Sequence, residues 1–331
     1  FDRLWQSSSI ANSEPLYFHE PKNMLYNMRA FFCLHSYFYN LCEEQMRTFL
    51  MNRSLIFFFV CILATVALHA QETIDTARFR AVYTFSYKTR PELVRFDERD
   101  CMFLDMGDRV VKFYSRYNYM RDSIAREGFK NKLSVMEIQD LRRGIPWGTE
   151  SVYYQWYNKK KTEVSTVFLH NGYTYEEPMT MPEWILHEDT MTVLGYVCKR
   201  ATTHYRGRDW EVYYTSDIPL SRGPWKLWGL PGLIVHATDA DGYFLFEMTN
   251  FERIPESVVR PILYIHRKEG SKGDYKGAEY KKVSKKTYIQ YEKAYHEDVN
   301  AFREFELGHK VFTPDGSPLP ITKTDYIPLE K

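Results

Sequence analysis

The sequence lacks a surplus of either charge and contains few cysteines. Its 44 Lys and Arg residues are balanced by 43 Asp and Glu residues, which leaves a net charge of +1 at pH 7. Proteins that bind nucleic acid carry a surplus of basic residues, so this balance argues against a nucleic-acid partner. Of the five cysteines, only Cys101 and Cys198 lie beyond residue 70. Such a pair in an oxidising compartment suggests one disulfide, and two buried free thiols are the alternative.

Sequence patterns of known catalytic and cofactor sites are also lacking. There is no Cys-x-x-Cys pair, no Gly-x-Ser-x-Gly elbow and no phosphate-binding loop. Two stretches, beginning at His187 and His296, start like the helix of a zinc protease but have no second His four residues on. We therefore expect no metal and no cofactor. The sequence does not decide whether the protein is an enzyme, although these absences favour a non-enzymatic role.

Residues 51–70 have the three parts of a signal peptide. Arg53 supplies a positive start, residues 55–68 form an apolar run without charge, and Ala70 is the small residue expected before the cleavage point. The run is shorter than the roughly 20 residues that a membrane-spanning helix needs. We expect cleavage before Gln71 and export to the periplasm, the outer-membrane periphery or the medium, with no transmembrane span in the mature chain. A short membrane anchor or a buried core helix is the alternative.

Residues 1–50 precede this signal, although a signal peptide works at the N-terminus of a chain. They begin with Phe1 rather than Met and show no sustained helix or strand period. We interpret them as a non-native upstream extension, expected to be disordered, with Met51 as the true start. A fragment with an unusual leading segment is the alternative. Residues 71–331 are long enough to bury a real core and are expected to form a single domain.

Within this part, alternating apolar and polar residues predict many strands. Residues 79–88 alternate with period two, and residues 101–105 and 109–114 predict a hairpin whose turn includes Gly107. Further hairpin turns are predicted at Asn171-Gly172, at Arg206-Gly207 and at residues 239–242. Strands joined by hairpin turns are typical of antiparallel sheets.

Helical spacing of apolar residues is confined to two segments, residues 121–142 and residues 284–305. There is no regular alternation of strand and helix of the kind that builds a parallel sheet. The predicted fold class is therefore α+β and mostly β, with a curved antiparallel sheet and one or two helices packed on one face.

Residues 195–238 contain several short motifs in a fixed order. They are Gly195-Tyr196-Val197-Cys198-Lys199-Arg200-Ala201, Tyr205-Arg206-Gly207-Arg208, Asp217-Ile218-Pro219-Leu220, Gly223-Pro224-Trp225-Lys226-Leu227 and Gly229-Leu230-Pro231-Gly232-Leu233-Ile234. In this order they resemble the GLPGLI family of exported bacterial proteins, found mainly in the Bacteroidetes. That family has no assigned activity, so the resemblance implies a compartment and a domain but no catalytic residue.

The last two motifs form a very apolar segment. Pro231 and Gly232 fit the two central positions of a type II turn, in which Gly232 would have a positive φ. One interpretation is a sharp corner buried in the core, and the other is a rigid, partly exposed aromatic wall of a ligand site. The candidate binding residues are Trp225, Trp228, Gly229, Leu230, Pro231, Gly232, Leu233 and Ile234.

Three functions remain open on the sequence alone. The first is a non-enzymatic envelope protein that binds an apolar or amphipathic ligand, or a protein partner, on the concave face of the sheet; the aromatic content of 17% motivates it. The second is a hydrolase with dispersed site residues, of which His204, Asp217 and His236 are the first candidates. The third is a structural or assembly component of an envelope complex that works through the apolar surface of residues 225–234.

Overall fold

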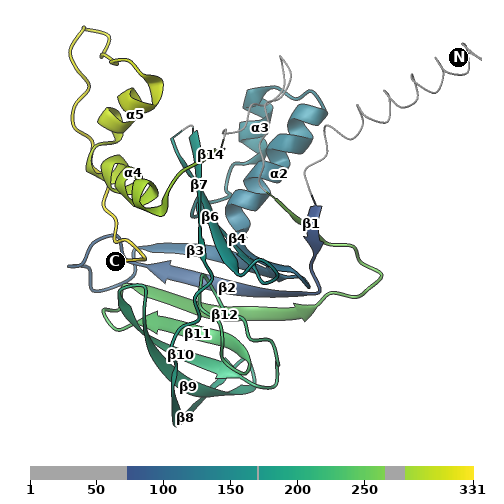
Figure 1. The fold of residues 1–331 in the computed structure, drawn as a ribbon. Helices are drawn as coiled ribbons and strands as arrows, with labels where there is room; N and C mark the ends of the chain where they lie inside the picture. Colours follow the sequence, from purple (N-terminus) through teal and green to yellow (C-terminus); the bar gives the residue numbers. More distant parts are fainter. Residues whose placement is uncertain (1–72, 170, 265–279) are drawn as a thin grey trace, which may run out of the picture. The chain divides into compact units, whose positions relative to one another are not determined.

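The computed structural model describes residues 73–169, 171–264 and 280–331, and strands are the commonest regular element among them (Figure 1). The strands are β1 (Thr73–Thr76), β2 (Phe79–Tyr87), β3 (Glu98–Met106), β4 (Val110–Ser115), β5 (Val152–Trp156), β6 (Lys161–Phe168), β7 (Asn171–Pro178), β8 (Ile185–Val193), β9 (Tyr196–Tyr205), β10 (Arg208–Thr215), β11 (Leu233–Asp239), β12 (Phe244–Arg253), β13 (Pro261–Leu263) and β14 (Tyr280–Lys282).

Twelve of these strands form one open sheet in the order β14-β7-β6-β5-β4-β3-β2-β12-β11-β10-β9-β8. Every neighbouring pair in it is antiparallel except β14 and β7, which are parallel. Strands β1 and β13 pair separately. The predicted fold class, mostly β with a large antiparallel sheet and a few helices, is confirmed.

One buried cluster of side chains forms the principal core. Strand β2 shows how the sequence builds it, because Ala81, Tyr83 and Phe85 alternate with more exposed residues and point to one side of the sheet. Inward side chains of β3 and β4 join the same cluster, and so do those of β9, β10, β11 and β12. Strands that lie far apart in the sheet order therefore meet through their side chains, so the sheet is strongly curved.

The two predicted helices are each divided in two. Residues 121–142 correspond to α2 (Arg116–Lys130) and α3 (Val135–Leu141), and residues 284–305 correspond to α4 (Lys285–Glu297) and α5 (Val299–Leu307). A reciprocal capping box between Ser134 and Glu137 starts α3 afresh. Asp298 ends α4 and caps the first turn of α5. The spacing of apolar residues does not reveal such breaks between helices, because each break is set by a single polar capping side chain.

The helices pack on the sheet through aromatic side chains. Tyr119 of α2 contacts Tyr114 of β4, with 5.7 Å between ring centroids. Tyr288 of α4 contacts Tyr175 of β7 at 4.7 Å. These two contacts belong to separate regions of the sheet (Figure 1). None of the helices among the described residues is both long enough and apolar enough to span a membrane.

All the predicted hairpins are formed, and in one of them the turn lies at a different position. Strands β9 and β10 are joined by Arg206 and Gly207, both with positive φ, as a tight two-residue turn requires. The turns at Gly107 and at residues 239–242 also join paired strands. Asn171-Gly172, by contrast, is part of β7, since Asn171 pairs with Phe168 of β6. The hairpin of β6 and β7 is therefore formed, but the Asn171-Gly172 dipeptide lies within its second strand and does not form the turn.

The C-terminal segment packs back onto the sheet. Ile327 and Leu329 contact the principal core. The guanidinium of Arg208, whose side chain is 1% exposed, donates hydrogen bonds to the carbonyl oxygens of Pro328 (2.6 Å) and Leu329 (3.2 Å) and pairs with a buried carboxylate of β11. The Lys331 N–H donates to the Arg206 carbonyl at 3.1 Å. The segment is extended, as its prolines predict, and it is held by buried polar groups.

Residues 1–72 and 265–279 lie outside the described residues. The upstream extension and the signal peptide fall within the first of these ranges, so each stays a prediction.

Candidate functional site

The apolar motif lies between β10 and β11, and most of it is buried. Trp225, Leu227 and Leu230 are at most 2% exposed and belong to the principal core. The Trp225 ring contacts Trp210 of β10 at 5.4 Å between centroids, and Trp225 itself has a left-handed φ of 57°. A tryptophan in this conformation is strained, and the surrounding packing stabilises it there. The motif therefore fills the concave side of the sheet.

This burial corrects two of the sequence-based hypotheses. The concave face is occupied by the protein's own side chains, so it does not offer the ligand site that we expected there. Most of the apolar surface of residues 225–234 is not available for assembly either, because Trp225, Leu233 and Ile234 are at most 1% exposed. The interpretation of the motif as a corner buried in the core accounts for most of its residues.

The Pro231-Gly232 corner differs from the predicted turn. Gly232 is not among the glycines with positive φ, so it does not form the predicted type II turn. It is required for another reason, since a Cβ atom at Gly232 would lie 2.0 Å from the carbonyl oxygen of Thr215 at the end of β10. Gly229 has the unusual backbone, with a φ of 102°. Gly232 therefore allows close packing against β10, and the positive φ predicted for Gly232 occurs at Gly229 instead.

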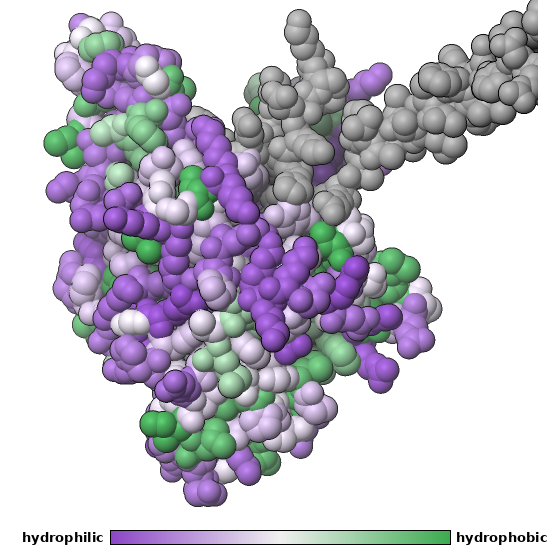
Figure 2. Space-filling model, in the orientation of Figure 1, coloured by the Kyte–Doolittle hydropathy of each residue, from purple (hydrophilic) through white to green (hydrophobic). Residues whose placement is uncertain are grey.

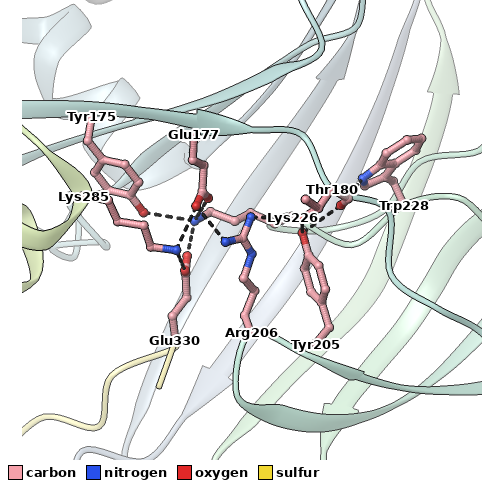
Figure 3. Close-up of polar contacts among 9 residues, drawn as sticks. All are labelled: Tyr175, Glu177, Thr180, Tyr205, Arg206, Lys226, Trp228, Lys285 and Glu330. Atoms are coloured by element: carbon pink, nitrogen blue, oxygen red, sulfur yellow. Dashed lines mark hydrogen bonds and ion pairs between the residues drawn. The ribbon is translucent and has the colours of Figure 1, made fainter.

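Lys226, in the centre of the motif, is buried together with charged partners (Figure 3). Its Nζ donates to Oε1 of Glu177 at 2.6 Å, to the hydroxyl oxygen of Tyr175 at 3.0 Å, and to the carboxylate of Glu330. Tyr175 and Glu177 belong to β7, and Glu330 belongs to the C-terminal segment. All three donors of the ammonium group are therefore used.

Two further cations complete this group. Lys285 of α4 donates to Oε2 of Glu177 at 2.8 Å and to Oε2 of Glu330 at 2.6 Å. Arg206 donates to Oε2 of Glu177 at 2.7 Å. We call these five residues the ionic network; they are Glu177, Arg206, Lys226, Lys285 and Glu330. It joins β7, the β9–β10 turn, the motif, α4 and the C-terminal segment.

The electrostatics of the ionic network indicate a structural link. Burial lowers the pKa of Lys226, while the two carboxylates act in the opposite direction. Burial alone would raise the pKa of Glu330, but the ammonium groups of Lys226 and Lys285 hold it below its ordinary value. Each member has an oppositely charged partner in hydrogen-bond contact, which is how buried charges are normally stabilised. The half-buried Glu292 of α4 lies nearby, and burial together with Glu330 raises its pKa to about 7.

The part of the motif that reaches the surface belongs to a second cluster. We call it the aromatic rim; it consists of Tyr157, Met181, Trp184, Arg222 and Trp228. The Trp228 indole N–H donates to the Thr180 carbonyl at 3.1 Å (Figure 3). The Trp184 indole N–H donates to the Trp228 carbonyl at 2.9 Å. Both N–H groups are thus satisfied within the protein, so the half-exposed parts of the two rings are fixed, apolar carbon surfaces.

The remaining members of the aromatic rim pack around these indoles. Tyr157, which follows β5, meets Trp228 edge to face with 6.3 Å between ring centroids. Met181 lies directly above Gly229, where a Cβ atom would be 2.6 Å from the Met181 Cγ. Three segments therefore meet at the rim, namely the β5–β6 turn, the loop between β7 and β8, and the motif.

Arg222 is the charged residue of the aromatic rim. Its guanidinium carbon lies 3.5 Å from the centroid of the Tyr157 ring, and its Nη1 donates to the Ser221 carbonyl at 2.8 Å. Within the described part of the chain, no carboxylate forms an ion pair with it. Burial lowers the pKa of Arg222, and the only neighbouring group that opposes this effect is Tyr157. An arginine that is half-buried, stacked and without an acidic partner is suited to an external anion.

The residues proposed for a hydrolase do not form a site. Nδ1 of His204 bonds Asp209 at 2.6 Å across the β9–β10 turn, and both side chains are exposed. Asp217 lies beyond the opposite end of β10, which spans Arg208–Thr215. His236 lies on β11 beside Tyr213. Among the residues that the structure describes, no group of His, Cys, Asp and Glu side chains could hold a metal ion.

Cys101 and Cys198 are free thiols, so the suggested disulfide is not formed. Cys101 lies on β3 and Cys198 on β9, and four strands of the sheet separate them. Burial raises the pKa of both thiols, which makes them poor nucleophiles.

Sequence analysis identified part of the site. Of the candidate binding residues, Trp228 and Gly229 are half-exposed and Pro231 is exposed, whereas Trp225, Leu230, Gly232, Leu233 and Ile234 are buried. It missed Tyr157, Trp184 and Arg222. No local pattern marks these three, because they are brought together only by the packing of distant loops.

Comparison with known proteins adds a family model without an assigned function. A model described as "Protein of unknown function (Porph_ging)" matches residues 208–236, which include the whole of Gly229–Ile234. This match is consistent with the resemblance drawn from the sequence. No curated protein shows significant similarity to the chain.

Comparison with solved structures finds matches of low structural similarity. They include PNGF-II in two crystal forms, with space groups P21 and C2. Each is 15% identical over 65% of this chain, with TM-scores of 0.40 and 0.39. The chain spans 32% of the length of PNGF-II. Similarity at this level does not support a statement about activity.

Proposed function

We propose that the protein is a non-enzymatic binding protein of the bacterial cell envelope, exported by the signal peptide predicted at residues 51–70. Its ligand is held at the aromatic rim. The observation that carries this proposal is the pair of half-exposed indoles, Trp184 and Trp228, whose N–H groups are bonded inside the protein. Rigid aromatic rings lose little conformational entropy when they bind, which is why they are frequent at binding surfaces.

The surface next to the aromatic rim is also apolar. Trp184 leads directly into β8, where Ile185 is 64% and Leu186 is 58% exposed. Figure 2 shows apolar residues gathered at the end of the molecule where β8 and β9 lie. Contiguous exposed apolar surface of this kind marks binding sites more often than chance. The rim therefore supports a ligand larger than the indole pair alone.

Binding by addition of a strand to β8 is disfavoured. Although β8 is an edge strand of the open sheet, its pairing with β9 shifts between Leu186 and Thr190. This bulge carries Glu188 and Asp189, which are exposed. Bulges and charged side chains are the features that protect sheet edges from pairing with another chain. The contact that we propose is made by side chains of the rim.

Native mass spectrometry of the protein, purified without detergent from cells that export it, tests the proposal. We expect a reproducible extra mass that disappears on organic extraction. A double variant, Trp184→Ala with Trp228→Ala, should lose this mass.

The matched control is Trp147→Ala, which removes a tryptophan that is 71% exposed elsewhere on the chain. This control should keep the extra mass. Retention of the mass in the double variant, with thermal unfolding like that of the wild type, would place the ligand elsewhere. A bare mass in all three proteins would count against a bound small ligand.

A further inference from the structure

The geometry of the aromatic rim points to the chemical class of its ligand. We infer that the rim binds a carboxylate carried on a flat ring, with the carboxylate at Arg222 and the ring against Trp228. This inference rests on the proposed function and makes it more specific. It follows from three features of the described residues, which are the free donors of Arg222, the local charge and the orientation of the rings.

The first feature is the set of free donors on Arg222. A guanidinium has five N–H donors in one plane, and the structure uses one of them, for the Ser221 carbonyl. Stacking on Tyr157 holds the plane of the group in place. The main chain is fixed as well, because the Arg222 carbonyl accepts a hydrogen bond from the Ile234 N–H at 2.9 Å. Two parallel N–H groups on such an edge match the two oxygens of a carboxylate.

The second feature is the local charge around the rim. Lys160 follows Tyr157 in the β5–β6 turn, is exposed and forms no ion pair with any described residue, whereas the ammonium of Lys159 lies over the Trp156 ring, 4.3 Å from its centroid. The exposed acids of the connections that carry Trp184 and Arg222 are Glu183 and Asp217. Lys226 is buried and fully paired, so it does not contribute to this surface. Arg222 and Lys160 are therefore the cations at the rim that can attract an anion.

The third feature is the arrangement of the rings. Arg222 stacks on Tyr157, and Tyr157 in turn meets Trp228 edge to face. An anion bound at the guanidinium edge therefore has an aromatic surface beside it, and a ring attached to that anion can pack on this surface. A phosphate without a ring would use the charge alone. The site thus favours a molecule that combines both groups.

Titration of the protein with benzoate, followed by the indole N–H signals of Trp184 and Trp228 in two-dimensional NMR spectra, tests this inference. The signals are assigned with the variants Trp184→Phe and Trp228→Phe. We expect a saturable shift of both signals with benzoate. Benzamide, which has the same ring without the charge, should bind at least about 10-fold more weakly, because a charge-assisted hydrogen bond is lost. Inorganic phosphate and cyclohexanecarboxylate should also bind more weakly than benzoate.

Two arginine variants and a control define the role of Arg222. Arg222→Gln should weaken benzoate binding about 10- to 100-fold. Arg222→Lys keeps the charge but loses the planar fork, so an intermediate loss is expected. Arg143→Gln, which removes an exposed arginine of the α3 C-terminus, should have no effect.

Each other outcome overturns the inference in a distinguishable way. Equal affinity for phosphate and benzoate would show an anion site without recognition of a ring. Unchanged binding in Arg222→Gln, or no shift of either indole signal, would show that the carboxylate is not bound there. If benzoate fails but an extra mass that depends on Trp184 and Trp228 is found by mass spectrometry, the proposed function stands and only the ligand class is wrong. Because the comparison with benzamide uses the wild-type protein, it does not depend on the folding of any variant.

Discussion

Replacing Glu177 should destabilise the protein more than replacing Lys226, although the two groups are bonded to each other. The ionic network holds three cations and two carboxylates. Glu177→Gln leaves Arg206 without its carboxylate and leaves the buried Lys226 with Glu330 alone. Lys226→Met leaves Glu177 paired with Arg206 and Lys285, and leaves Glu330 paired with Lys285. The remaining charges are unbalanced in the first variant and balanced in the second.

The expected magnitudes follow from burial. Glu177 is 5% exposed, and removal of one partner from a buried pair costs about 3–5 kcal/mol of the free energy of unfolding. Lys226 is 1% exposed, but methionine keeps most of its apolar stem, so its replacement should cost about 1–3 kcal/mol in lost hydrogen bonds. The midpoints of these two ranges differ by about 2 kcal/mol, which is the expected difference between the two variants.

Urea denaturation at pH 7.5, followed by circular dichroism, measures both variants. The comparison is valid if the dependence of the free energy on urea is the same as in the wild type. Lys293→Met, which removes an exposed cation paired with Glu297 on α4, is the control and should leave stability unchanged. If Lys226→Met proves as costly as Glu177→Gln, the carboxylates depend on Lys226 and the argument from charge balance is refuted.

Three further predictions concern other parts of the chain. Burial raises the pKa of Glu292 to about 7, above its value in the unfolded chain. The contribution of Glu292 to stability is therefore full below about pH 4.5 and is lost as the pH rises to about 7. Glu292→Gln should therefore be more stable than the wild type at pH 8, by at most about 3 kcal/mol, and this gain should vanish at pH 4; a constant difference in urea midpoints would contradict the shift. Gly232→Ala places a methyl group against the Thr215 carbonyl and should cost more than about 3 kcal/mol in the same assay, whereas a neutral result would mean that this corner can move. N-terminal sequencing of the exported protein should begin at Gln71; a start at any other residue would refute the predicted cleavage point.

The structural features that could be predicted from the sequence are those that depend on residues next to one another in the chain. The turn at Arg206-Gly207 was predicted because its backbone preference lies in the two residues themselves. Asn171-Gly172 has an equally favourable composition, but its position is set by pairing with β6 and by the ring of Tyr280, which lies 2.8 Å from where a Gly172 Cβ would be. Local preference therefore fails where a partner strand decides the register.

The site was harder to predict than the fold. The apolar character of the motif indicated burial, and this explains Trp225 and Leu230. The aromatic rim, however, depends on Trp184 and Arg222, which lie in separate loops. Only the folded structure brings them together, through the hydrogen bond of Trp184 and the stacking of Arg222. The pairing of Lys226 with a carboxylate near the end of the chain likewise has no counterpart in local sequence, since it depends on how the last segment folds back.

The docking of the C-terminal segment sets the order in which the protein can fold. Arg208 and Lys226 are buried, and both take partners from residues 328–330, which follow all the described strands and helices in the sequence. Pairing of β2 with β12 likewise joins segments that are synthesised far apart in time. Until residue 330 has been added, the nascent chain has two buried cations without their full set of acceptors and a core without its final side chains. If the chain is exported as proposed, this delay keeps it loosely structured while it passes through a narrow channel, and folding is completed on the far side.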